Sequence, residues 1–147
     1  MKQTKTIQII HLAFCAAILA FGVVAIMITK DNLFFGLEFK NADPVVFIAH
    51  IFALISLVIS GLLFNKLIGN IDSNIRSTEK ITQYQTAFLV KCAFLEGAAL
   101  FNIVACLVTN NALTLIFATI CLAYLWLSRP TDQKIYETLQ MQDPNSF

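Results

Sequence analysis

Four long apolar runs dominate the pattern of hydrophobic and polar positions along this chain. They cover about 7–29, 45–67, 83–108 and 112–128, and more polar segments separate them. About 20 apolar residues in an α-helix cross the roughly 30 Å of hydrocarbon in a bilayer. The pattern therefore predicts an all-α protein: a four-helix transmembrane bundle in one integral membrane domain covering 1–147, with a tail at 129–147.

Local signals mark the ends of these predicted helices. Asp43 before Pro44 is typical of an N-cap followed by a proline in the first helical turn. The pair Gly69 and Asn70 suits the end of the same helix. The segment "TNNA" at 109–112 predicts a tight turn, so the third and fourth helices should form an antiparallel hairpin.

A short amphipathic helix is predicted beyond the fourth run. The pair Arg129 and Pro130 ends that run, and Asp132 is a candidate cap for the next helix. Ile135 and Leu139 are four residues apart and share one face. We expect this C-terminal surface helix to lie on the membrane surface or on a partner.

Composition agrees with a membrane location and excludes several other classes. Hydrophobic residues make up 58% of the chain and charged residues 13%, and the mean hydropathy is +0.74. The net charge of +1 gives no indication of a nucleic-acid partner. The cysteines lie inside apolar runs without a CxxC pair, which favours buried, unreactive thiols over disulfides or a zinc site: Cys15, Cys92, Cys106 and Cys121.

Lysine and arginine are distributed unequally between the two predicted sides of the membrane. One side carries seven, namely Lys2, Lys5, Lys66, Arg76, Lys80, Arg129 and Lys134, whereas the other carries Lys30 and Lys40. Positively charged loops stay in the cytoplasm. We therefore expect both termini in the cytoplasm, with Trp126 in the aromatic belt at the cytoplasmic interface.

The third run, which contains "KCAFLEGAALFNIV" at 91–104, carries polar residues where a membrane helix is normally apolar. Glu96 is near its centre, where a charge costs about 2.5 to 3.5 kcal/mol of insertion free energy. Lys91 is nearer the cytoplasmic edge, where its long stem lets the ammonium reach the interface. Since the two are five residues apart, they do not form an i,i+4 pair. Each therefore needs a partner elsewhere.

Two helix faces are candidates for that contact. Ala93 and Gly97 form a small-xxx-small pair beside Glu96, and the second run offers Ser56 and Ser60 on a strip of small residues. We expect the second and third helices to pack on these surfaces, with a serine hydroxyl near Glu96. Gln85 shares the Glu96 face, so it belongs to the candidate intramembrane polar site.

Glu96 has three possible roles. Desolvation favours the protonated carboxyl, so Glu96 is a candidate proton or cation site. It is also a candidate hydrogen-bonded group that fixes helix packing, or a group paired with a basic residue of another subunit.

The remaining polar residues do not form a recognisable catalytic or metal site. His11 lies about five residues from the predicted cytoplasmic end of the first helix, and His50 about five residues from the outer end of the second. Their depths in the membrane therefore differ by roughly 15 Å, so they do not suit one metal or one haem. We expect each to be an interfacial, hydrogen-bonded histidine. No G-x-S-x-G, H-E-x-x-H or P-loop pattern occurs, and we expect no metal and no cofactor.

The segments "YQTAFLVKCAFLEGAALFNIVACLVTNN" (84–111) and "LAYLWLSRP" (122–130) resemble a group of uncharacterised four-helix membrane proteins of Bacteroidetes-type bacteria. The resemblance covers the second half of the chain, and its most distinctive part is the glutamate-glycine-alanine run. It implies a multi-pass protein of the bacterial inner membrane and implies no activity.

Three functional interpretations remain open. The first is a non-enzymatic accessory subunit or scaffold, surrounded by lipid and assembled as a homo-oligomer or with other membrane subunits. The second is a small proton- or cation-coupled transport or conducting protein that uses Glu96. The third is a haem or quinone oxidoreductase subunit, which depends on the presence of two histidines.

Overall fold

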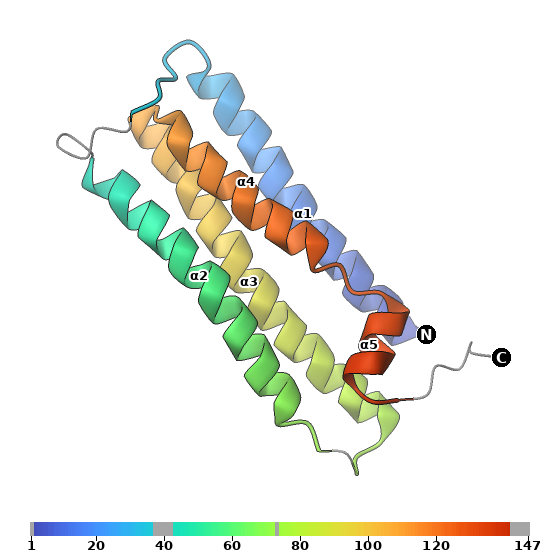
Figure 1. Ribbon diagram of the computed structural model, residues 1–147. Helices are drawn as coiled ribbons and strands as arrows, with labels where there is room; N and C mark the ends of the chain where they lie inside the picture. The colour runs from blue at the N-terminus through green and yellow to red at the C-terminus, as the bar shows by residue number, and fades with distance from the viewer. Residues whose placement is uncertain (1, 37–42, 73, 142–147) are drawn as a thin grey trace.

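The computed structural model describes residues 2–36, 43–72 and 74–141. It contains α1 (Lys2–Thr29), α2 (Pro44–Gly69), α3 (Ser77–Thr109), α4 (Ala112–Leu127) and α5 (Asp132–Thr138). Figure 1 shows the first four as long helices lying side by side, with α5 crossing one end of the group. Among the described residues the single β-type contact is a bridge between Phe34 and Asn111. The predicted all-α class is confirmed.

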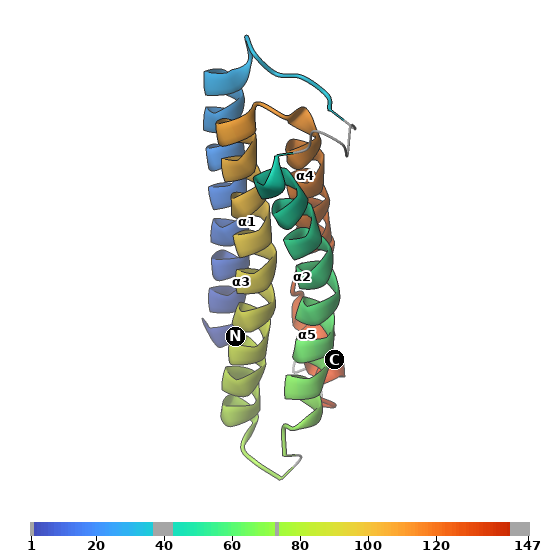
Figure 2. The same ribbon diagram turned by 90° about the vertical axis from the view of Figure 1, so that its left-hand side faces the viewer.

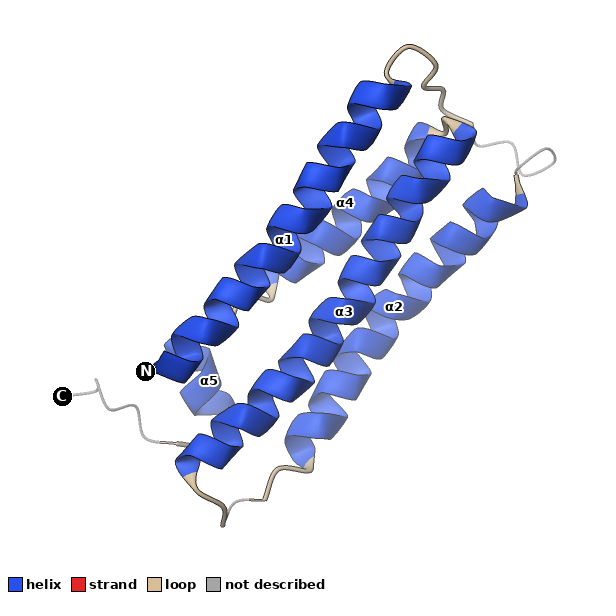
Figure 3. Cartoon of the chain, turned by 180° about the vertical axis from the view of Figure 1, so that it is seen from behind, coloured by secondary structure: helices blue, strands red, loops and turns tan. Residues whose placement is uncertain are grey.

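Helix α3 is the centre of the bundle, because it packs against α1, α2 and α4. Figure 2 shows α2 and α3 running together along their length. In Figure 3 α3 lies between α1 and α2, with α4 on the far side and no helix in front. One face of α3 is therefore not covered by another described helix. We call the end of the bundle that carries α5 and the start of α1 the α5 end.

The predicted helix boundaries follow the caps that the sequence indicates. The Asp43 carboxylate accepts a hydrogen bond from the backbone N–H of Val45 at 3.0 Å, and Pro44 begins α2. Asn110 ends α3 in the left-handed conformation with φ 55°. The Asn111 side chain then accepts from the Leu113 N–H at 3.0 Å and caps α4. The predicted hairpin of the third and fourth helices is confirmed.

Helix α5 differs from the prediction in its cap and in its position. Its N-cap is Thr131, whose hydroxyl accepts from the Lys134 N–H, while Asp132 accepts a 3.1 Å bond from the Gln8 amide of α1. Ile135 and Leu139 are buried in the same core cluster as residues of α1, α3 and α4. The apolar face of α5 therefore packs on the bundle itself. The prediction that this face lies on a membrane surface or on a partner is wrong.

Three helices of the described chain are long and apolar enough to cross a membrane, namely α1 from Thr4, α2 and α3. Helix α4 has 16 residues, which is about 24 Å of helix, and it reaches spanning length only when combined with α5, to which it is bent by 78°. The described chain therefore has three candidate membrane spans, or four if α4 and α5 together form one, where the sequence predicts four. The apolar lengths indicate a membrane protein.

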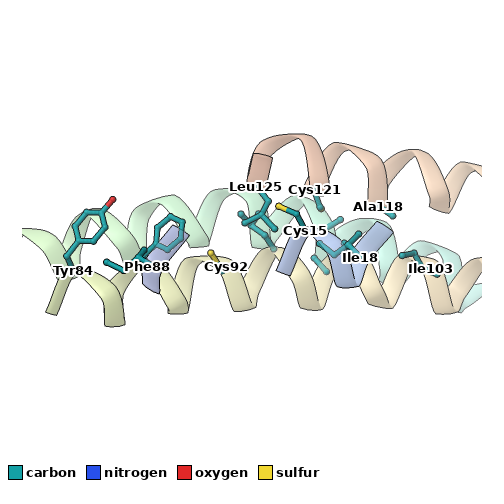
Figure 4. Close-up of a cluster of buried hydrophobic side chains, with 14 of the residues drawn as sticks. Cys15, Ile18, Tyr84, Phe88, Cys92, Ile103, Ala118, Cys121 and Leu125 are labelled. Carbon is teal, nitrogen blue, oxygen red and sulfur yellow. The ribbon is translucent and has the colours of Figure 1, made fainter. Parts of the chain in front are cut away.

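The interior is a continuous cluster of apolar side chains along α3. Figure 4 shows Tyr84, Phe88, Cys92 and Ile103 along α3, facing residues of α1 and α4. All four cysteines are free and buried, as the sequence predicts. Large apolar side chains also cover the outer surface, for example at Ile26, Met27 and Ile28 in consecutive positions of α1. An outer surface this apolar suits contact with lipid.

Candidate functional site

Glu96 lies well inside the apolar part of α3. It precedes Thr109 by 13 residues, which is about 20 Å along the helix axis. Its side chain is partly exposed, and it makes no hydrogen bond or ion pair with another described residue. The structure therefore places an ionisable group deep in the apolar zone without a partner within the described chain.

The expected bond between Glu96 and a serine of α2 is not formed. Ser60 donates a 3.2 Å bond to the Leu57 carbonyl of its own helix, and the buried Ser56 hydroxyl has no protein partner among the described residues. The reason is angular. Residues six apart on an α-helix point about 120° away from each other, so Glu96 is turned away from Asn102, which does contact α2. The prediction that the side of α3 beside Glu96 packs against α2 is therefore wrong.

The side of α3 that carries Glu96 faces towards α1. Ile103, two turns beyond Glu96 on the same side, lies 3.8 Å from the position that a Cβ on Gly22 of α1 would occupy. Gln85, three turns before Glu96 on this side, is half-buried and has no hydrogen bond to a described residue. Glu96 and Gln85 therefore share a face, as predicted, without forming a site with the serines.

The predicted helix contact at Ala93 and Gly97 is not made with any other helix in the described part of the chain. Ala93 is exposed, and a Cβ built on Gly97 would have no atom within 4 Å. Ala93 and Gly97 therefore lie on a side of α3 that no described helix covers. We name Val90, Ala93, Gly97, Leu100 and Val104 the open α3 face, with Glu96 at its edge. Its members are exposed or half-buried and recur at helical spacing.

Asn102 is the polar residue that joins α3 to α2. Its side-chain nitrogen donates bonds of 2.9 Å to the carbonyls of Ala49 and Ala98, and the side chain is fully buried. Its carbonyl oxygen has no protein partner among the described residues. We did not predict this contact. The signal in the sequence was an asparagine within the third apolar run, together with the small residues Ala49 and Ala53 in the second run.

Lys91 occupies an aromatic environment near the α5 end. Its ammonium lies 5.3 Å from the centre of the Phe64 ring and 5.0 Å from that of Tyr124, distances typical of cation–π contacts. It forms no ion pair with a described residue. The residue borders a pocket that α5 helps to enclose. Its stem therefore reaches towards the α5 end of the bundle, and the expected cytoplasmic position of that end stays a prediction.

The two histidines have different surroundings. His11 Nε2 lies 2.9 Å from the Leu125 carbonyl of α4 and is buried, so His11 is the hydrogen-bonded histidine that we predicted. His50 stacks on Phe117 with ring centres 4.1 Å apart, and its Nε2 has no protein partner in the described part of the chain. The hydrogen bond that we expected for His50 is therefore not formed there, because the ring packs flat against Phe117. Leu125 and Phe117 are eight residues apart on α4, about 12 Å, so the histidines belong to separate environments.

Trp126 lies in the last turn of α4, beside the α5 end, and 53% of its surface is exposed. An exposed tryptophan close to the end of an apolar helix is the arrangement expected at a membrane interface.

In comparisons with known proteins, no family model, no curated protein and no solved structure matches the chain. The resemblance to four-helix proteins of Bacteroidetes-type bacteria therefore stays a prediction.

Proposed function

We propose that this chain is a non-enzymatic accessory or scaffold subunit of a larger membrane assembly, and that it joins this assembly through the open α3 face. One observation carries the proposal: Glu96 is deep in the apolar zone, partly exposed, and has no hydrogen-bonding partner in the described chain. Its partner would be a helix of a second copy or of another membrane subunit.

The free-energy cost of placing the partly exposed Glu96 carboxylate in a membrane supports this interpretation. A charge at the centre of a membrane helix costs about 2.5 to 3.5 kcal/mol, and a hydrogen-bond donor on an adjoining helix offsets part of that cost. Ala93 and Gly97 leave room for such a helix, because neither presents a large side chain and the Gly97 position is open. Close helix approach at small residues is a common basis of association in membranes.

We propose a location in a bacterial inner membrane, with the α5 end in the cytoplasm. The described basic residues at the α5 end include Lys66, Arg76 and Lys134, whereas Lys30 follows α1 at the opposite end. This asymmetry follows the positive-inside rule.

The alternatives have less support from the geometry. A proton-conducting role for Glu96 needs further polar groups in line with it. The buried polar atoms without protein partners in the described chain, at His50, Ser56 and Asn102, belong to the α2 side of α3 or to α2 itself. A haem role would require His11 to give up its contact with Leu125.

Photo-cross-linking within native membranes tests the proposal. A photoreactive amino acid replaces Ala93 on the open α3 face, and the matched control replaces Ala17, which is exposed on α1. We expect one discrete product from position 93, either a dimer of this chain or a stoichiometric complex with one subunit, and no such product from position 17. Equal, diffuse labelling from both positions would contradict the proposal.

The substitution Glu96→Gln separates this role from proton or cation transport. It keeps the size and the hydrogen-bonding capacity of the side chain but cannot release a proton. As a scaffold, the Gln variant should give the same cross-linked product and support the same growth or assembly phenotype. Normal assembly with loss of function would favour transport instead.

A further inference from the structure

A pocket of about 250 Å³ lies at the α5 end, between α2, α3, the end of α4 and α5. Its lining includes Phe64, Tyr84, Lys91, Ser128, Lys134 and Glu137. Helix α5 completes this pocket because its apolar side is packed into the bundle while Lys134 and Glu137 stay exposed. The pocket therefore adjoins both the aqueous end of the bundle and its apolar body.

The charged groups of the pocket are not neutralised by one another. Lys91 and Lys134 form no ion pair with a described residue, and the Glu137 carboxylate instead accepts a 2.8 Å bond from the Gln133 amide. Two ammonium groups and one carboxylate give a formal charge of +1. This charge complements a ligand group with a single negative charge.

The pocket also contains hydrogen-bond donors that have no acceptor among the described residues. Ser128 donates its proton to the Tyr124 carbonyl at 2.8 Å, and Thr138 donates to the Lys134 carbonyl at 2.6 Å. The ammonium groups of Lys91 and Lys134 keep free donors. Cation–π contact with Phe64 and Tyr124 holds the Lys91 ammonium in place without using its N–H groups as conventional hydrogen bonds.

Aromatic packing fixes the apolar wall of the pocket. Tyr84 and Phe88 are stacked with an interplanar angle of 7°, and Phe64 meets each of them edge-on. Figure 4 shows the Tyr84 and Phe88 rings at one end of the core cluster. The Tyr84 hydroxyl has no hydrogen bond to a described residue, so it adds a third donor at the pocket.

We propose that this pocket binds a phosphate group carrying one negative charge, as in the phosphodiester of a phospholipid headgroup, between the ammonium groups of Lys91 and Lys134. Charge-assisted bonds from lysine to phosphate are stronger than neutral ones. A position at the end of the spanning helices is where lipid phosphates lie. The inference is independent of the subunit contact at the open α3 face, which involves other residues.

Thermal unfolding in a phosphate-free detergent tests this site. The ligand is dioleoyl phosphatidylglycerol, and the comparison ligand is dioleoylglycerol, which has the same chains without phosphate. A separate titration uses inorganic phosphate against chloride at equal ionic strength, which distinguishes a soluble phosphate from a lipid. Ligand binding to the folded state raises Tm with concentration.

The variants are Lys91→Gln, Lys134→Gln and the control Lys66→Gln, an exposed lysine of the last turn of α2 that does not line the pocket. We expect phosphatidylglycerol to raise Tm, and its apparent Kd to weaken about tenfold in each pocket variant but not in Lys66→Gln. Lys134 is exposed, so its variant folds even if Lys91→Gln does not.

A rise in Tm with inorganic phosphate that is weakened in Lys134→Gln would support the same site, with a soluble phosphate as its ligand. Equal shifts from phosphatidylglycerol and dioleoylglycerol would overturn the proposal. So would equal weakening in Lys66→Gln and Lys134→Gln, because that result would reflect surface charge alone.

Discussion

The side-chain amide of Asn102 in α3 donates a 2.9 Å hydrogen bond to the backbone carbonyl of Ala49 in α2. The donor is fully buried, and Ala49 is too small to hold the two helices apart. Helices in lipid associate through close packing of small residues and through such interhelical bonds. This contact therefore helps to hold α2 against a side of α3 other than the open α3 face.

Replacing Asn102 with alanine should weaken the α2–α3 contact. We expect the free energy of unfolding in detergent to fall by about 1 to 2 kcal/mol, since the interhelical bond is lost and a small cavity remains. The matched control is Asn65→Ala, at an exposed position of α2, where a change within about 0.5 kcal/mol is expected. Equal losses in the two variants would mean that the Asn102 bond does not hold the helices together.

Gly97→Leu should leave the fold of the isolated chain intact. A Cβ at this position meets no atom within 4 Å, and leucine favours a helix over glycine by up to about 1 kcal/mol. The change in Tm of a monomeric preparation should therefore be zero or positive. Gly22→Leu is the comparison, because a Cβ there already contacts Ile103 at 3.8 Å, and a larger side chain should lower Tm. A large fall in Tm for Gly97→Leu would show that the open α3 face is packed within the chain.

The packing of α5 can be tested at Ile135, which is fully buried. Ile135→Ala should reduce stability by about 2 to 5 kcal/mol if the whole bundle responds, or release α5 alone if it opens as a unit. Limited proteolysis in detergent measures the second effect as faster cleavage near Arg129. Gln133→Ala, on the exposed side of α5, should leave the cleavage rate unchanged. Resistance of the Ile135 variant to cleavage would contradict the packing described.

Orientation in the membrane is testable with single cysteines at exposed positions on opposite ends. Asn32 follows α1, and Asn74 lies between α2 and α3. Because basic residues concentrate at the α5 end, we expect a membrane-impermeant thiol reagent to label position 32 from outside intact cells and position 74 only after lysis. Labelling of both positions from the same side would be incompatible with an α2 that spans the membrane.

The sequence was sufficient to predict the helices and several of their ends. Apolar length gave the four long helices, and Asp43, Pro44 and the two asparagines of the 109–112 turn act as predicted. Helix α3 begins at Ser77, six residues before the apolar run, because polar residues also form helix where the chain meets water. Periodicity also placed Glu96 and Gln85 correctly on one face of α3.

The sequence could not assign a neighbour to each face of α3. Small residues at Ala93 and Gly97 suit a helix contact, but they do not reveal whether the second helix belongs to the same chain. That depends on how four helices are arranged around one another, which apolar pattern alone leaves undetermined. The same applies to α5, whose apolar face fits a bundle end as well as a membrane surface.

The mass of the particle purified from native membranes in a mild detergent tests the proposed subunit role most directly. A single chain has a mass of 16.4 kDa. We predict a protein mass larger than this, from a homo-oligomer or a stoichiometric partner, and a return to 16.4 kDa in Gly97→Leu without loss of the folded state. A wild-type particle with the mass of one chain and no associated protein would contradict the account.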